Sequence, residues 1–399
     1  MSPFFDRPRR PRTPPRRGTA GKIPLMPRRS VKKAAASDGF QVSRMSALMS
    51  GLVHRYPRLW IRIGDAESRE LSSVLADVSV REPIYIAGLA RAGSTILLEL
   101  VASSEGVITH RYRDFPPVFI PYWWNRFVDR AQTRVLEPQE RAHGDRIRIT
   151  PESPEAMEEP LWMAFFPSSH DAAVSHSLGD RHHHPEFERF YRDHIRKLLL
   201  VRRGTRYASK GNYNVTRLEY LLSIFPDARI VIPIREPVRH IASLLRQHQR
   251  FSEACEGNPR GLAHLRQAGH FEFGLDRRPI NTGDGVRTAE ILRLWREGEE
   301  LRGWARYWSQ VYGYVAERLQ ANERLREAAL VVRYEDLCDS PVTMVRSVLK
   351  HCRVAAGEPI IDAFSSRLSS PNYYTWQFTD EELEVIREET EATGVRFGY

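Results

Sequence analysis

A glycine-rich turn between an apolar segment and a helix-like segment carries the residues best suited to chemistry. Gly88, Gly93 and Thr95 keep the spacing of the phosphate-binding pattern G-x-x-x-x-G-K-[ST]. The backbone N–H groups of such a turn, backed by the positive end of a helix, favour a phosphate-like anion. We therefore expect an anion site where the apolar strand before residue 88 meets the helix that follows.

The turn departs from that pattern at the position of its cation. Ser94 occupies the lysine position, and the loop instead carries Arg91. An enzyme that splits a nucleoside triphosphate needs the lysine on the β- and γ-phosphates. The turn thus predicts anion binding without ATP hydrolysis.

A second segment repeats the arrangement of an apolar strand followed by a helix. The strand is expected over 229–234, with Arg235 at its carboxyl end and Pro237 in the first helical turn, where the missing N–H costs nothing. Ser243 lies two turns into that helix. An arginine at a strand end and a serine on the next helix can both reach one phosphate at the crevice of a parallel sheet.

Together these segments resemble the sulfotransferases that use 3'-phosphoadenosine 5'-phosphosulfate (PAPS). The family's 5'-phosphosulfate loop usually reads P-[KR]-S-G-T-T, and residues 235–243 are similar to its 3'-phosphate motif. A third stretch, 330–337, is similar to the family's Y-E-D segment. The resemblance covers roughly residues 81–355, and it implies that the cofactor is held by Gly88, Arg91, Ala92, Gly93, Ser94, Thr95, Arg235 and Ser243.

The loop departs from the family form in ways that indicate a branch. Ala90 replaces the loop proline and Ala92 a serine, whereas Ser94 replaces a threonine and keeps a hydroxyl. We find no R-K-G stretch near the C-terminus. These features favour the Golgi-type or bacterial branches, in which the loop cation is often arginine.

The resemblance implies in-line transfer of a sulfuryl group from PAPS to a hydroxyl of a carbohydrate or other small molecule, without a metal. In the transition state, negative charge spreads over the three equatorial oxygens of the sulfuryl group. Catalysis therefore depends mainly on positioning the reactants and on cations that stabilise this charge. Arg91 is the first expected cation. Lys210, at the end of a short apolar strand, resembles the lysine of the family's K-x-P segment. Two other function classes stay open: a P-loop nucleotide kinase-like enzyme, and a catalytically degenerate nucleotide-binding protein.

Candidates for the general base come from two acidic regions. His110 and Asp114 lie shortly after the first helix, where related enzymes carry such a group. A second region holds Glu155, Glu158 and Glu159. We favour Asp114, then Glu159. The run 182–184 of three histidines stands beside a proline without further metal-ligand spacing, so we interpret it as a solvated loop.

The net charge of +10 is concentrated at the N-terminus. Residues 1–40 hold eleven basic and two acidic residues, which leaves the rest nearly neutral, and we expect no nucleic-acid surface on the globular part. The proline-rich tail is predicted to be disordered. It could tether the chain to an anionic surface or nucleic acid, or be a solvated extension, and we favour the extension.

The remaining chain predicts an α/β fold of P-loop type, a parallel sheet with helices on both faces. Residues 41–80 are expected as a helical lead-in, 81–399 as the α/β domain, and 251–285 as an insertion loop. No segment reaches 18 apolar residues, and no secretory h-region follows the tail. With three cysteines lacking framework spacing, a reducing cytoplasmic location is expected; the sequence leaves the oligomeric state open.

We predict that residues 1–39 are dispensable for catalysis. A chain that begins at Phe40 should fold and keep its kcat on a small acceptor, because the tail holds charge but no apolar periodicity. It should leave a cation-exchange resin at lower salt, since its net charge falls from +10 to about +1. A folded, shortened chain that has lost activity would assign the tail to the active site.

Overall fold

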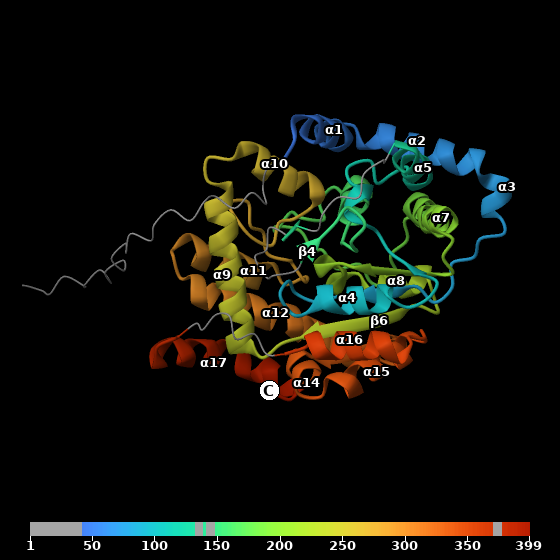
Figure 1. The fold of residues 1–399 in the computed structure, drawn as a ribbon. Helices are drawn as coiled ribbons and strands as arrows, with labels where there is room; N and C mark the ends of the chain where they lie inside the picture. Colours follow the sequence, from blue (N-terminus) through green and yellow to red (C-terminus); the bar gives the residue numbers. More distant parts are fainter. Residues whose placement is uncertain (1–41, 132–138, 141–147, 370–376) are drawn as a thin grey trace, which may run out of the picture. The chain divides into compact units, whose positions relative to one another are not determined.

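A computed structural model describes residues 42–131, 139–140, 148–369 and 377–399 of the chain (Figure 1). The predicted tail over 1–40 lies outside these residues. A five-stranded sheet forms the centre, and all of its neighbouring strands run parallel. Its order across the sheet is β2 (Val107–Ile108), β5 (Arg206–Lys210), β1 (Ile84–Ile86), β6 (Arg229–Ile234) and β7 (Ala329–Arg333). A separate antiparallel pair joins β3 (Gln139–Glu140) and β4 (Arg148–Ile149).

Helices occupy the stretches before and between the strands. The stretch expected as a helical lead-in contains α1 (Arg44–Arg55), α2 (Pro57–Glu70) and α3 (Ser72–Leu75). Between β1 and β6 lie α4 (Ser94–Ala102), the 3-10 turn η2 (Tyr112–Asp114), α5 (Pro121–Ala131), α6 (Glu159–Phe165), α7 (Pro185–Arg202), the 3-10 turn η3 (Asn212–Thr216) and α8 (Leu218–Ile224).

The remaining helices lie on either side of β7 in the sequence. Between β6 and β7 come α9 (Pro237–Cys255), α10 (Pro259–Ala268), α11 (Gly285–Arg296), α12 (Glu300–Ala321) and α13 (Glu323–Ala328). After β7 follow α14 (Tyr334–Asp339), α15 (Pro341–Cys352), α16 (Glu358–Arg367), α17 (Asp380–Gly394) and the 3-10 turn η4 (Val395–Phe397). Among the described residues, no helix combines the length and the apolar character needed to cross a membrane.

The strands are apolar on both faces, as a sheet covered by helices on both sides requires. Tyr85, Ile230 and Ile232 pack into one core with α7, α8 and α12. Ile86 and Val231 pack into a second core with α4, α15 and α16. Successive side chains of a strand point to opposite faces of the sheet, so each strand contributes to both cores. The predicted α/β fold class is confirmed.

The stretch 251–285, expected as a long loop, is largely helical in its first half. Helix α9 continues to Cys255, and α10 follows after a short turn. Asn258 begins α10: its side-chain oxygen accepts from the N–H of Gly261 at 2.9 Å, and Pro259 supplies the first helical position. The glycine and arginine content of this stretch obscured an ordinary capped helix in the sequence.

The topology brings the candidate residues to one edge of the sheet. Because the strands are parallel, their carboxyl ends lie together, and there the turn after β1, Lys210 at the end of β5, and Arg235 just after β6 meet. The fold thus brings the turn after β1 close to two segments that lie more than a hundred residues further along the chain.

Candidate active site

The turn between β1 and α4 needs glycine at two positions. A Cβ on Gly88 would stand 2.6 Å from the carbonyl oxygen of Pro233, on the neighbouring strand β6. Gly93 has φ +99° and lies so close to the Tyr334 ring that a Cβ would come within 2.8 Å of it. Both glycines therefore allow the backbone to approach another strand end closely, which keeps the turn tight at the start of α4.

Arg91 links this turn to the second predicted motif. Its Nε donates a hydrogen bond to the Ser243 Oγ on α9 at 3.3 Å. Arg91 has φ +73°, a left-handed backbone that a non-glycine residue adopts at a cost. The loop cation and the serine of the presumed 3'-phosphate motif, which the sequence placed in separate segments, are thus in direct contact.

The His240 side chain binds a backbone carbonyl of the same turn. Trp308 donates its indole N–H to His240 Nδ1 at 3.2 Å, so Nε2 carries the proton that it donates to the Ala90 carbonyl at 2.9 Å. Burial, with Arg235 and Arg91 nearby, lowers the pKa of His240 to about 3. A neutral ring therefore anchors the turn without adding a further positive charge. Sequence reasoning missed His240, although it lies inside the motif that runs from Arg235 to Ser243.

Arg235 is almost completely buried beside the third motif. Its guanidinium stacks on the Tyr334 ring at 4.9 Å from the centroid. Its Nε has no hydrogen-bond partner among the described residues. The next residue of the motif, Glu335, accepts from the N–H of Glu236 at 3.2 Å and from the Tyr399 hydroxyl at 2.6 Å. The Y-E-D-like segment therefore packs under the start of α9 and supports Arg235.

Lys210, at the end of β5, contacts both the start of α4 and the segment that precedes α6. Its ammonium donates to the Thr95 hydroxyl at 2.8 Å and forms an ion pair with Glu155 at 2.9 Å. The Tyr112 hydroxyl donates to the other Glu155 oxygen. Lys210, Thr95 and Glu155, with Arg91 and the buried Ser94, line a cleft at the carboxyl edge of the sheet.

The far wall of the cleft comes from the turn after α10. Here His270 lies 3.6 Å from Glu272, which also accepts from the Asn212 amide at 2.7 Å. Burial would lower the pKa of the His270 ring, but Glu272 outweighs this effect and raises it. Phe251 and Phe273 add apolar surface. In the sequence these residues were part of an expected loop without a recognisable pattern.

Glu159 lines the same cleft, but its carboxylate is already paired. Arg217 binds both of its oxygens, at 2.7 and 2.8 Å, and His170 Nε2 lies 2.8 Å from one of them. Burial alone would raise the pKa of Glu159, but Arg217 and His170 outweigh it and lower that pKa to about 2. A carboxylate held in this way is a poor proton acceptor.

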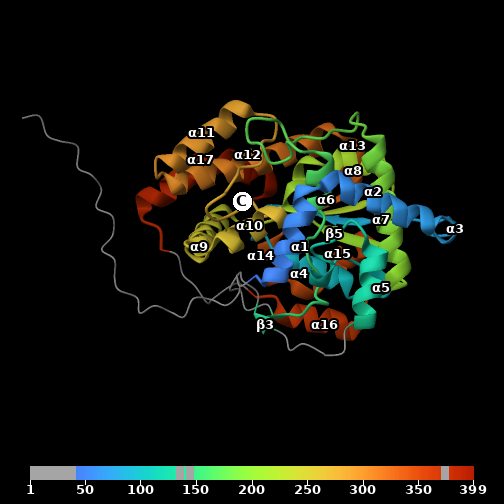
Figure 2. The same cartoon turned by 90° about the horizontal axis from the view of Figure 1, so that it is seen from above.

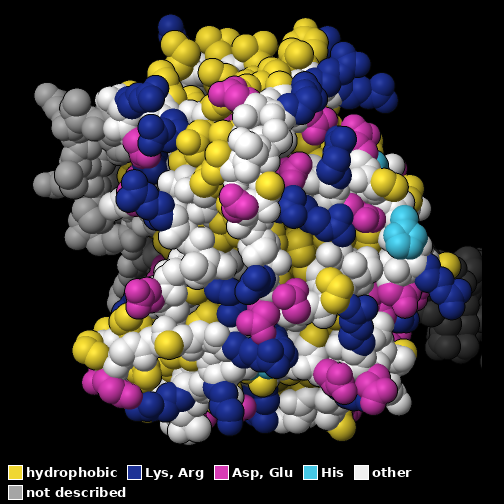
Figure 3. Space-filling view, turned by 90° about the vertical axis from the view of Figure 1, so that its right-hand side faces the viewer, with side chains coloured by type: hydrophobic (Ala, Val, Ile, Leu, Met, Phe, Trp, Pro, Cys, Tyr) yellow, Lys and Arg dark blue, Asp and Glu magenta, His cyan; other side chains and the backbone are white. Residues whose placement is uncertain are grey.

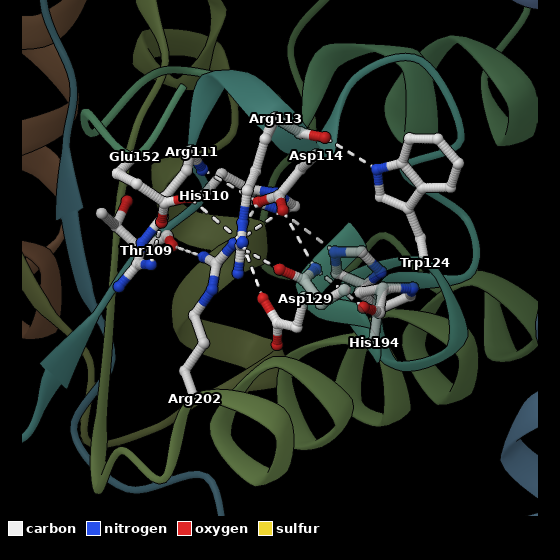
Figure 4. Close-up of polar contacts among 12 residues, drawn as sticks. Thr109, His110, Arg111, Arg113, Asp114, Trp124, Asp129, Glu152, His194 and Arg202 are labelled. Carbon is white, nitrogen blue, oxygen red and sulfur yellow. Dashed lines mark hydrogen bonds and ion pairs between the residues drawn. The ribbon is translucent and has the colours of Figure 1, made fainter. Parts of the chain in front are cut away.

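Asp114 and His110 lie in a separate buried cluster (Figure 4). Asp114 accepts from Arg202 at 2.6 and 2.7 Å and from the Asn125 amide at 3.1 Å. His110 Nδ1 stands 3.3 Å from Asp114, and its Nε2 is 3.0 Å from His194 Nε2. Burial would raise the pKa of Asp114, but His110 and Arg202 hold it well below its usual range.

None of the residues in this cluster is among the described residues that line the cleft. Sequence reasoning chose Asp114 by its distance from Arg91 along the chain. The short turn η2 instead directs its carboxylate toward Arg202, at the end of α7. The cluster connects η2 and α5 to α7, and its contacts give Asp114 and His110 a structural role.

The three consecutive histidines precede α7. His184 caps the helix, because its Nδ1 accepts from the Phe187 N–H at 3.2 Å. His183 is solvent-exposed and lies 3.8 Å from Glu188. Within the described ranges, no group of three or more His, Cys, Asp or Glu side chains is arranged to hold a metal ion.

Comparison with known proteins bears on this arrangement. Residues 83–271 match the model described as the sulfotransferase family. No curated protein sequence matches the chain.

Three solved structures are similar at 14% sequence identity. The sulfotransferase STF1 from Mycobacterium tuberculosis H37Rv has a TM-score of 0.47, with 89% of each chain covered. The sulfotransferase STF9 from Mycobacterium avium has a TM-score of 0.49, with 89% of this chain and 86% of that chain covered. A sulfotransferase from Alicyclobacillus acidocaldarius has a TM-score of 0.39, with 80% and 94% covered.

We predict that His240→Ala weakens the binding of 3'-phosphoadenosine 5'-phosphate. The substitution removes the hydrogen bond that anchors the turn at Ala90, and a neutral hydrogen bond contributes about 0.5–1.5 kcal/mol. Isothermal titration should show a loss of affinity of roughly two- to ten-fold. An unchanged affinity in a folded variant would separate His240 from the anion site.

The neutrality of His240 has its own test in the pH dependence of stability. Its pKa in the folded protein, about 3, lies below the ordinary histidine value of 6.5, so the unfolded chain binds a proton first as the pH falls. Wild-type stability should therefore fall between pH 6.5 and 4.5 by about 2 kcal/mol more than that of His240→Gln. Urea unfolding at both pH values measures the difference, and parallel changes in the two proteins would contradict a neutral ring.

Proposed function

We propose that this chain transfers a sulfuryl group from PAPS to a hydroxyl of a carbohydrate or other small molecule, because residues 83–271 match the model of the sulfotransferase family. The observation that carries the proposal is the hydrogen bond of 3.3 Å from Arg91 to the Ser243 hydroxyl. A second hydrogen bond, of 2.8 Å, joins Lys210 to the Thr95 hydroxyl of the same turn. One end of the donor would lie on the turn after β1, the other at Arg235. The contact between Arg91 and Ser243 supports the interpretation that the two motifs bind one donor.

The 3'-phosphate is assigned to Arg235 and Ser243. Arg235 is 6% exposed, and its Nε has no hydrogen-bond partner in the described part of the chain. Leaving a buried donor unpaired costs free energy, which a phosphate oxygen would recover. This unpaired donor supports PAPS rather than a nucleotide that lacks the 3'-phosphate.

The 5'-phosphosulfate is assigned to the turn after β1. Ser94 and Thr95, at the start of α4, line the cleft together with Arg91 and Lys210. In the reaction the bond between sulfur and the phosphate oxygen breaks while the acceptor oxygen bonds to sulfur. Positive charge at Arg91 and Lys210 stabilises the negative charge on the sulfuryl and leaving-group oxygens.

Glu155 is the base that the geometry supports best. It lines the cleft and lies 2.9 Å from Lys210, next to the expected position of the transferring group. Glu159 and Asp114, the candidates favoured from the sequence, are each bound by an arginine through short contacts. Glu155 would take the proton of the acceptor hydroxyl as the new oxygen–sulfur bond forms.

The donor can be tested without knowing the acceptor. Isothermal titration of the full chain should show binding of 3'-phosphoadenosine 5'-phosphate and weaker binding of ATP, because ATP has no 3'-phosphate to pair with Arg235. Tighter binding of ATP would favour a nucleotide kinase-like enzyme instead.

We predict that Glu155→Gln lowers kcat by on the order of 100-fold while the affinity for 3'-phosphoadenosine 5'-phosphate changes little. A base works only when deprotonated, so the wild-type rate should decline at acidic pH and the residual rate of the variant should not. Glu159→Gln and Asp114→Asn serve as comparisons. If either keeps its fold and reproduces the altered pH profile, Glu155 is not the base.

We predict that Arg235→Ala removes most of the preference for the 3'-phosphorylated nucleotide. A charged hydrogen bond contributes about 1.5–3 kcal/mol, so the ratio of affinities for the nucleotides with and without the 3'-phosphate should fall roughly ten-fold or more. Arg239→Ala is the matched control, because Arg239 lies four residues further along the chain, on α9, and is exposed. Full discrimination in the Arg235 variant would locate the phosphate elsewhere.

A further inference from the structure

Helix α1 carries apolar side chains on the side that faces away from the protein. Met45, Leu48, Leu52 and Tyr56 are spaced three, four and four residues apart, which places them on one helical face. Together with Leu59 at the start of α2 they are 51–73% exposed. We call these five residues the α1 face. Ser50 and Val53 form the opposite, buried side of α1, so this helix is apolar toward solvent as well as toward the protein.

The α1 face is bordered by positive charge. Arg44, Arg55, Arg58 and Arg62 are all exposed, and the sequence from 44 to 62 contains no carboxylate. None of the four arginines forms an ion pair with the described part of the chain. Figure 3 shows hydrophobic side chains gathered along the upper edge of the molecule, where α1 and α2 lie in Figure 1, with Lys and Arg side chains beside them.

We propose that the α1 face docks onto the surface of a bilayer that contains anionic lipids. Apolar side chains enter the boundary between headgroups and acyl chains, while the arginines meet lipid phosphates. The helix has 12 residues, which is too short to span a bilayer, so it lies in the plane of the interface. The eleven basic residues of the segment 1–40, which directly precedes α1, add a second attraction to the same surface.

Charge argues against the other occupants of this face. A second copy docking through the same face would bring two sets of four arginines together without a carboxylate between them. The N-terminal segment of this chain carries eleven basic and two acidic residues, so it is repelled by the arginine border as well. An anionic surface is the partner that matches both the apolar stripe and its border.

Binding of the full-length chain to vesicles tests the proposal. We expect sedimentation with vesicles of phosphatidylcholine and phosphatidylglycerol, weak binding to phosphatidylcholine alone, and a decrease of binding at high salt. Leu48→Gln with Leu52→Gln should lower the partition coefficient on the order of ten-fold, because both side chains lose their apolar contact with the lipid. The variant keeps every positive charge of the N-terminal segment, which separates the α1 face from that segment.

Matched variants control for a general loss of apolar or charged surface. Val286, on α11, is 76% exposed, and Val286→Gln should leave vesicle binding unchanged. Arg44→Gln with Arg55→Gln should weaken binding to the anionic vesicles by about five-fold for each arginine, whereas Arg181→Gln, in an exposed loop before α7, should not.

Two outcomes would overturn the proposal. One is unchanged vesicle binding in the Leu48 and Leu52 variant. The other is a dimer in solution, seen by light scattering without vesicles, that the same variant dissociates; this would assign the α1 face to a second copy of the chain. Because Leu48 and Leu52 are exposed, their replacement should leave thermal unfolding unchanged, and if it does not, the arginine pair provides the same test.

Discussion

Three positively charged side chains lie close together at the carboxyl edge of the parallel sheet. The surrounding residues must stabilise this concentration of charge. Arg91, Lys210 and Arg235 come from the ends of three neighbouring strands, and each has a different partner. Arg91 donates to the Ser243 hydroxyl, Lys210 pairs with Glu155, and Arg235 stacks on Tyr334. His240, which touches the same turn, is kept neutral by burial. These cations are placed so that an anionic donor could pair with them.

The three carboxylates considered as the general base, Asp114, Glu155 and Glu159, have different partners. Arg202 holds Asp114 and Arg217 holds Glu159 through short contacts, and the side chains of both pairs are largely shielded from solvent. Removing either acid would leave a buried positive charge without compensation, which is costly. Glu155 also has a cationic partner, but that partner is Lys210, which itself faces the turn where the donor would bind. This difference in partners is the reason for proposing Glu155, rather than Asp114 or Glu159, as the base.

Helix α10 connects the α1 face to this chemistry. The Ser50 hydroxyl of α1 donates to the Gln267 side chain of α10 at 2.6 Å, and the two helices lie side by side in Figure 2. The residues after α10, from Gly269 to Phe273, form the far wall of the cleft. If α1 docks onto a bilayer, only helix α10 separates the docked helix from this wall of the cleft.

The sequence alone was sufficient for features that are local. The glycines at 88 and 93, the cation at Arg91, and the strand, proline and serine around Arg235 predicted both phosphate motifs and the parallel α/β fold, because spacing along the chain decides turn geometry and strand-to-helix junctions. What needed the tertiary structure was the choice among carboxylates. Asp114 looked suitable until Arg202, 88 residues away, was seen to bind it. The roles of His240 and Glu155, the capped helix hidden in the expected loop, and the outward apolar side of α1 likewise depend on which distant groups become neighbours. Such long-range pairings follow from packing, which the local pattern of residues does not encode.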